Sequence, residues 1–132
     1  MLTEAVPDLR RVLAPHRAGN DPTTLLAAGH FWRATLTPQG EGTMHLDWTD
    51  GRCVARAWGP GASWLLDRVP DWIGAGDTPE PFGPESHRCV LDAQRSVGMI
   101  RLSNGHCLYH TLLPTVIAQR VTSIEAARSW RA

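Results

Sequence analysis

The chain has 132 residues, a hydrophobic content of 42% and no net formal charge. This length and composition suit one ordinary domain with a packed core, and the neutral charge gives no global electrostatic case for nucleic acid. No run approaches the roughly 20 apolar residues of a membrane span, and three cysteines without close spacing favour a reducing cytoplasm over a secreted disulfide scaffold.

The first half of the chain predicts a helix followed by a sheet. Residues 1–20 are predicted to form a short helical leader, because Val6, Leu9 and Leu13 recur at helical spacing. Alternating residues and the Asp-Gly pair at 50–51, a strong hairpin signal, then predict an antiparallel sheet. Its strands are expected at Phe31–Leu36, Thr43–Trp48 and Arg52–Trp58.

Helices are predicted to follow. Pro60–Val69 is expected to be one helix that covers the sheet and is interrupted at Pro70. The segment 74–84 is rich in glycine, proline and acids and is interpreted as a linker. A further helix is expected from Glu85 to Val97, ended by Gly98.

This order of elements indicates an α+β fold: a small antiparallel sheet with a covering helix, then helices only. The expected divisions are a helical leader at 1–20, an α/β domain at 21–83 and a helical region at 84–132. Six tryptophans are many for this length. Most of those in the sheet-and-helix unit are interpreted as core residues. A base-stacking platform is the alternative.

The last segment predicts two helices joined by a tight turn. The first is expected to begin near His106 and to carry an apolar stripe to about Val121. Thr122 and Glu125 have the spacing of a capping box, in which the two side chains bond the free amides at a helix start. The second helix reaches Ala132 without a stop signal, so we expect the chain to be cut inside an element.

Four stretches carry a resemblance to a known family. They are Trp32–Pro38, Ala57–Pro70, Gly98–Leu102 and Val116–Ala127. Their order and spacing resemble the helix-hairpin-helix DNA glycosylases, and within them the 3-methyladenine DNA glycosylase II branch, over roughly 21–132. No single stretch is diagnostic by itself.

The resemblance implies a base-excision repair function, namely removal of alkylated purines from double-stranded DNA without a metal or organic cofactor. It also implies a small α/β domain ahead of a helical one. In that family the Gly-rich hairpin that grips DNA and the assisting aspartate lie downstream of the matched region. The chain is therefore expected to be a front portion without a catalytic residue of its own, and inactive by itself.

Gln119, Arg120 and Thr122 are the predicted DNA-binding residues. They lie at the turn between the last two helices, where side chains and free amides can meet a phosphate. The resemblance implies that Arg120 projects toward the gap left by an extruded base. The alternative is that Gln119 and Arg120 only solvate a helix end.

Charge distribution is compatible with such a site. From residue 85 onward six arginines face three acidic residues, a net charge of +3, whereas residues 1–84 carry −3. A DNA-facing C-terminal half explains this split, and so does chance.

Other groupings of reactive side chains carry weaker expectations. His87 and Cys89, together with His106, Cys107 and His110, match no standard zinc spacing, so no metal site is predicted. The pairs Asp67/Asp71 and Asp47/Asp50 lack a nucleophile or an apolar pocket and are expected to be solvated carboxylates.

The expected location is the bacterial cytoplasm, with the protein on the nucleoid when bound to DNA and no membrane partner. Exposed apolar residues of the last helices predict self-association or a frayed C-terminal hairpin. Two rival functions stay open: a non-enzymatic remnant that binds DNA or has a structural role, and an α+β module that binds a small molecule.

Overall fold

The computed structural model describes residues 2–3, 8–17, 21–49, 52–78, 80–98 and 100–131, with only the backbone course at 2, 3, 123, 127, 130 and 131. The fold is α+β, as predicted. Its elements are β1 (Leu2–Thr3), α1 (Leu9–Leu13), the 3₁₀ helix η1 (Ala14–His16), β2 (Thr24–Ala27), β3 (His30–Thr37), β4 (Gly40–Asp47), β5 (Cys53–Trp58), α2 (Ala62–Asp67), α3 (Val69–Trp72), α4 (Arg88–Val97), α5 (Leu108–Ala118) and α6 (Ser123–Arg131).

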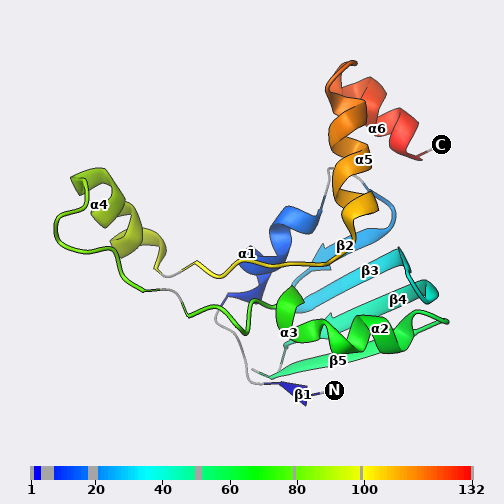
Figure 1. The fold of residues 1–132 in the computed structure, drawn as a ribbon, viewed down its shortest axis with the longest axis horizontal. Helices are drawn as coiled ribbons and strands as arrows, with labels where there is room; N and C mark the ends of the chain where they lie inside the picture. The colour runs from blue at the N-terminus through cyan, green and yellow to red at the C-terminus, as the bar shows by residue number, and fades with distance from the viewer. Residues whose placement is uncertain are drawn as a thin grey trace.

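The strands form one antiparallel sheet in the order β1-β5-β4-β3-β2 (Figure 1). The long central strands β3 and β4 pair along their whole length, from His30 opposite Asp47 to Thr37 opposite Gly40. Strands β4 and β5 pair as the hairpin predicted from the sequence. The Asp50-Gly51 pair itself lies outside the described residues.

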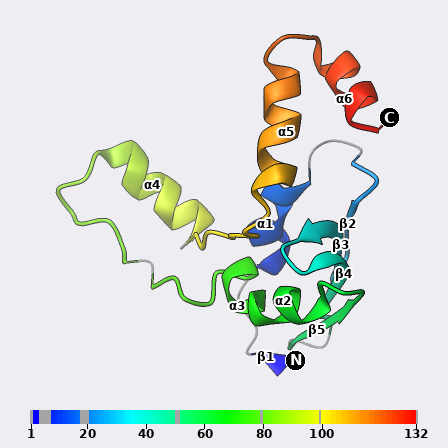
Figure 2. The same cartoon turned by 45° about the vertical axis from the view of Figure 1, so that its right-hand side comes forward.

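Helices α1, α2 and α3 cover one face of the sheet (Figure 2). Leu65 of α2 is fully buried, and its methyl group would lie 2.8 Å from a Cβ added at Gly42. A glycine in β4 therefore lets α2 approach the sheet closely. The side chains under 2% exposed form the core there: Leu9, Leu13, Phe31, Met44, Leu46, Cys53, Leu65, Val69, Trp72 and Ile73.

Most of the five tryptophans in the sheet-and-helix unit are core residues, as predicted, because the partly buried Trp48 packs against the core together with Trp64 and Trp72; the other two are not. Trp64 and Trp72 are buried, but Trp32 and Trp58 are 37% and 48% exposed on the uncovered face of the sheet. There the two rings stack with centroids 5.7 Å apart. The inward face of β3 instead carries Phe31 and three polar residues.

Several predicted helix bounds need correction. Leu2–Thr3 pair with β5, so the first 20 residues contribute a strand as well as the predicted helix; Val6 lies outside the described residues. The single helix predicted at 60–69 is two short helices that meet at Arg68. The helix predicted from Glu85 begins at Arg88, and α5 begins two residues after His106.

Helices α4, α5 and α6 stand away from the sheet (Figures 1 and 2). Neither α4 nor α5 has a buried residue. At its start, α5 is held to the sheet by His110, whose Nδ1 lies 2.7 Å from the Thr35 hydroxyl. Within the described residues, no helix combines the length and apolar character that crossing a membrane requires.

Candidate nucleic-acid interface

The predicted DNA-binding residues lie at the tip of the α5–α6 hairpin. Gln119, Arg120 and Thr122 are all exposed. The end of α5 is closed by backbone bonds, with the Gln119 amide donating to the Val116 carbonyl at 3.3 Å and the Arg120 amide to the Ile117 carbonyl at 3.4 Å. The turn therefore has a defined backbone, and its side chains face solvent.

The capping box predicted at the start of α6 is confirmed. The Glu125 amide donates to the Thr122 hydroxyl at 3.3 Å, and the Thr122 amide donates to the Glu125 carboxylate at 3.1 Å. The Thr122 hydroxyl donates to that same carboxylate at 2.8 Å. Both polar groups of Thr122 thus serve the cap.

The cap has an electrostatic consequence for ligand binding. Hydrogen bonds from the Thr122 hydroxyl and amide hold the pKa of Glu125 below its usual value, so its carboxylate is ionised at neutral pH. A negative charge at the start of α6 disfavours a phosphate at that point.

Arg120 is the basic residue of this turn. Its guanidinium forms no ion pair or hydrogen bond with the residues that the structure describes. Helix α5 has 11 residues, which corresponds to about 16 Å of rise. Helix α5 forms an arm that stands away from the sheet (Figure 1). The His110–Thr35 bond lies in the first turn of α5, whereas Arg120 follows Ala118, the last residue of the helix, so Arg120 lies at the end of the arm opposite this contact.

A buried polar network beneath the base of this arm was not predicted from the sequence. Arg33 of β3 is 4% exposed and pairs with the buried Asp21 at 3.1 Å. The same guanidinium donates to the Thr24 hydroxyl and, at 3.3 Å, to the His16 carbonyl. Its Nε has no partner among the described residues. The network joins η1, β2 and β3.

Two histidines border this network. Burial, and secondly the charge of Arg33, lower the pKa of His16 to about 4, and the same two causes lower the pKa of His110. Both rings are therefore neutral at pH 7. His16 hydrogen-bonds through Nε2 to the Ser103 hydroxyl, and its ring lies 4.5 Å from that of Trp72. The network is structural: it ties the segment before α5 to the sheet.

Among the described residues, the histidines and cysteines considered for a metal form no group whose ligand atoms could share one ion. His106 pairs with Asp71 at 2.8 Å, His110 bonds Thr35, and His87 accepts the Cys89 amide at 3.2 Å at the start of α4. His106 precedes α5 with a positive φ of 52°. It therefore does not share a helix face with His110.

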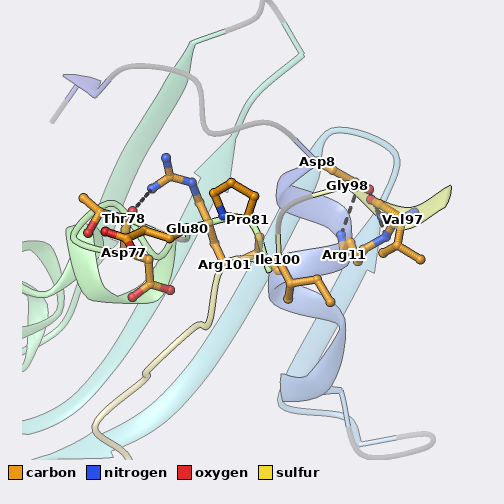
Figure 3. A pocket seen from close by; sticks show the side chains of 11 residues that line it. Asp8, Arg11, Asp77, Thr78, Glu80, Pro81, Val97, Gly98, Ile100 and Arg101 are labelled. Atoms are coloured by element: carbon orange, nitrogen blue, oxygen red, sulfur yellow. Dashed lines mark hydrogen bonds and ion pairs between the residues drawn. The ribbon is translucent and has the colours of Figure 1, made fainter. Parts of the chain in front are cut away.

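A cavity of about 730 Å³ lies between α1 and the segments on either side of α4 (Figure 3). Both arginines that line it are engaged. Arg11 donates to the Val97 carbonyl at 2.9 Å and pairs with Asp8 at 3.1 Å. Arg101 donates to the carbonyls of Gly74 and Asp77, each at 2.8 Å. These bonds hold α4 and its flanking segments to the sheet and its covering helices, residues 8–74, called the sheet unit below.

No protein-family model, no curated protein and no solved structure matches this chain. The function proposed below consequently depends on the resemblance of the sequence and on the geometry of the α5–α6 turn.

Proposed function

We propose that this chain is the DNA-contacting front portion of a base-excision repair protein of the 3-methyladenine DNA glycosylase II kind. Its partner is double-stranded DNA that carries an alkylated purine. The observation that carries the proposal is Arg120, an arginine without a partner among the described residues, at the exposed tip of the α5–α6 hairpin. Gln119 and Thr122 flank it, and Thr122 acts by fixing the turn through the cap.

Arg120 contributes by occupying the space that an extruded base vacates. Extrusion breaks stacking and pairing at a cost of a few kcal/mol. A long planar guanidinium that enters the gap restores part of the stacking and can hydrogen-bond the orphaned base or a phosphate. In this role Arg120 is a binding residue. No residue of the chain is assigned to cleavage of the glycosidic bond.

The apolar surface of the helical region supports a larger assembly. Leu112 and Val116 of α5 and Ile124 of α6 are 49%, 57% and 68% exposed. Side chains of this size stabilise a fold by roughly 1.5–3 kcal/mol each when buried. In a complete glycosylase, further helices of the catalytic domain would cover them. Self-association through the same surface is the alternative for the chain alone.

The test is binding to two short duplexes, one intact and one with an abasic-site analogue, measured by fluorescence anisotropy at several salt concentrations. We expect Arg120→Ala to weaken binding to the abasic duplex about five- to tenfold and to reduce the salt slope by about one. Arg10→Ala, on the exposed side of α1, is the matched control and should leave both values unchanged.

Three outcomes discriminate among the readings. Binding that prefers the abasic duplex and depends on Arg120 supports the proposal. Equal affinity for both duplexes would leave a DNA-binding chain with no role in base extrusion. Absence of salt-dependent binding to either duplex contradicts the proposal and favours a small-molecule-binding module.

A further inference from the structure

The uncovered face of the sheet carries three side chains that play no part in DNA contact at the α5–α6 turn. His30 begins β3, and His45 and Asp47 belong to β4 beside it. His30 Nδ1 lies 3.2 Å from His45 Nε2 and 3.9 Å from Asp47 Oδ1. One ligand atom from each residue lies within 4.8 Å of the other two, and no other such group occurs among the described residues.

The distance between the two ring nitrogens has a chemical meaning. Two imidazole lone pairs repel each other at 3.2 Å unless a proton or a cation lies between them. Nitrogens bound at about 2.0–2.1 Å to a tetrahedral zinc ion lie about 3.3 Å apart. The observed pair thus already has the spacing of two ligands on one edge of a zinc tetrahedron.

The fold holds these groups in place. His45 is 7% exposed although it lies on the uncovered face, because the Trp32 ring stacks on it with centroids 4.0 Å apart and an interplanar angle of 14°. Asp47 lies directly opposite His30 in the strand register. The Thr49 amide and hydroxyl donate to the Asp47 carboxylate at 3.1 and 2.8 Å, which orients it. Outer bonds of this kind orient metal ligands.

We propose that His30, His45 and Asp47 bind one zinc-class divalent cation, with the fourth position open to water. Two imidazole nitrogens and one carboxylate are a borderline donor set, which suits zinc, cobalt or nickel and not the oxygen-seeking magnesium or calcium. The cation would link β3 to the end of β4. This inference is independent of the proposed DNA function.

The neighbouring Arg56 provides a second way to test the site. Arg56 of β5 is paired with His45 in the register, so both lie on the uncovered face. Its positive charge opposes that of a bound metal ion. Arg56→Gln should therefore tighten metal binding several-fold, which a merely structural histidine pair would not predict.

The experiment is a titration of the full chain with Co²⁺, followed by the visible absorption of tetrahedral cobalt, and then displacement by Zn²⁺. We expect one equivalent to bind. His30→Ala and Asp47→Asn should each weaken binding at least about tenfold, since loss of even an outer-shell contact costs about 10–100-fold. His106→Ala is the matched control, because His106 and Asp71 form another histidine–aspartate pair without a third ligand.

Circular dichroism of each variant checks that it folds. His30 is chosen for substitution because its side chain is 39% exposed, so its removal leaves no cavity in the core. The proposal is overturned if Co²⁺ does not bind with one-to-one stoichiometry. It is equally overturned if folded His30→Ala binds like the wild type, or if His106→Ala loses binding as much as His30→Ala does. Failure of DNA binding at Arg120 would not affect any of these results.

Discussion

Different forces stabilise the sheet unit, residues 8–74, and the helical region, which the structure describes over residues 84–98 and 100–131. In the sheet unit, Phe31, Leu65 and Trp72 belong to a continuous buried core. In the helical region, among the side chains described, only Ala126 is a buried hydrophobic residue, and the helices are held by caps and single polar contacts such as His110–Thr35.

The two regions therefore differ in whether their apolar side chains are buried or exposed. The packed core stabilises the sheet unit, because burial of apolar area is the dominant favourable term in folding. The helical region leaves Arg120 and several apolar side chains exposed, where the proposed function requires them. Regions with few buried contacts also open most readily.

The largest expected effect distinguishes the two regions by the same leucine-to-alanine change made once in each. Leu65→Ala removes a fully buried side chain and should lower the free energy of unfolding by about 2–5 kcal/mol. Leu112→Ala, in which the same change is made at a 49% exposed position of α5, should change it by less than about 0.5 kcal/mol. Urea denaturation measures both. Equal losses would show that α5 is packed as tightly as the sheet unit.

A smaller effect concerns acid stability of the sheet unit. The pKa of His16 is lowered from 6.5 to about 4 in the folded chain, so the unfolded chain binds the proton more readily. Stability should therefore decrease as the pH falls from 6.5 to 4, with at most about 3 kcal/mol from this residue. Burial also lowers the pKa of His110, which therefore contributes to the same pH dependence. The contribution of His16 alone is measured by comparing the wild type with His16→Gln.

We expect His16→Gln, which keeps a hydrogen-bonding group near Ser103, to flatten the pH dependence of the unfolding free energy over this range. Identical pH dependence in the two proteins would mean that His16 is solvated in the folded chain. His110 of α5, whose pKa is also lowered, should contribute equally to both curves.

The smallest effect lies within the helical region. Thr122→Ala removes the cap of α6 and should cost about 1 kcal/mol, confined to that helix. Thr115→Ala is the control, because the Thr115 hydroxyl only bonds the carbonyl of Thr111 one turn earlier in α5. Amide hydrogen exchange of α6 reports the difference. Faster exchange throughout the sheet unit in Thr122→Ala would show that the two regions unfold together.

Local features were the ones that the sequence could predict. The Thr122–Glu125 cap spans one turn of chain, and it forms as expected. Gly98 ends α4 with a φ of 78°, as a glycine at a helix end should. The inward direction of Met44 and Leu46 followed from simple alternation.

Which side chains of β3 point toward the core could not be predicted from the residues of that strand alone. Trp32, Ala34 and Leu36 form the more apolar set, yet Phe31, Arg33 and Thr35 point inward. The register decides this, because Phe31 lies opposite the buried Leu46. The charge of Arg33 is tolerated inside only because Asp21, from a segment 12 residues earlier, compensates it.

The same limit applies to the candidate sites. That His45 and Asp47 share a face is a consequence of strand periodicity, but their approach to His30 depends on the turn that sets the β3–β4 register. The exposure of Arg120 agrees with its predicted place in a turn. The sequence does not show which arginines are already paired in the folded chain. The structure shows that Arg11 and Arg101 are.

The most direct test of the account is amide hydrogen exchange of the chain with and without a duplex that contains an abasic-site analogue. We predict slower exchange on DNA binding at residues 117–125, around Arg120, and no change in the core strands β3 and β4. Arg120→Ala should remove that protection. Protection centred on the sheet with an unchanged α5–α6 turn would contradict the account.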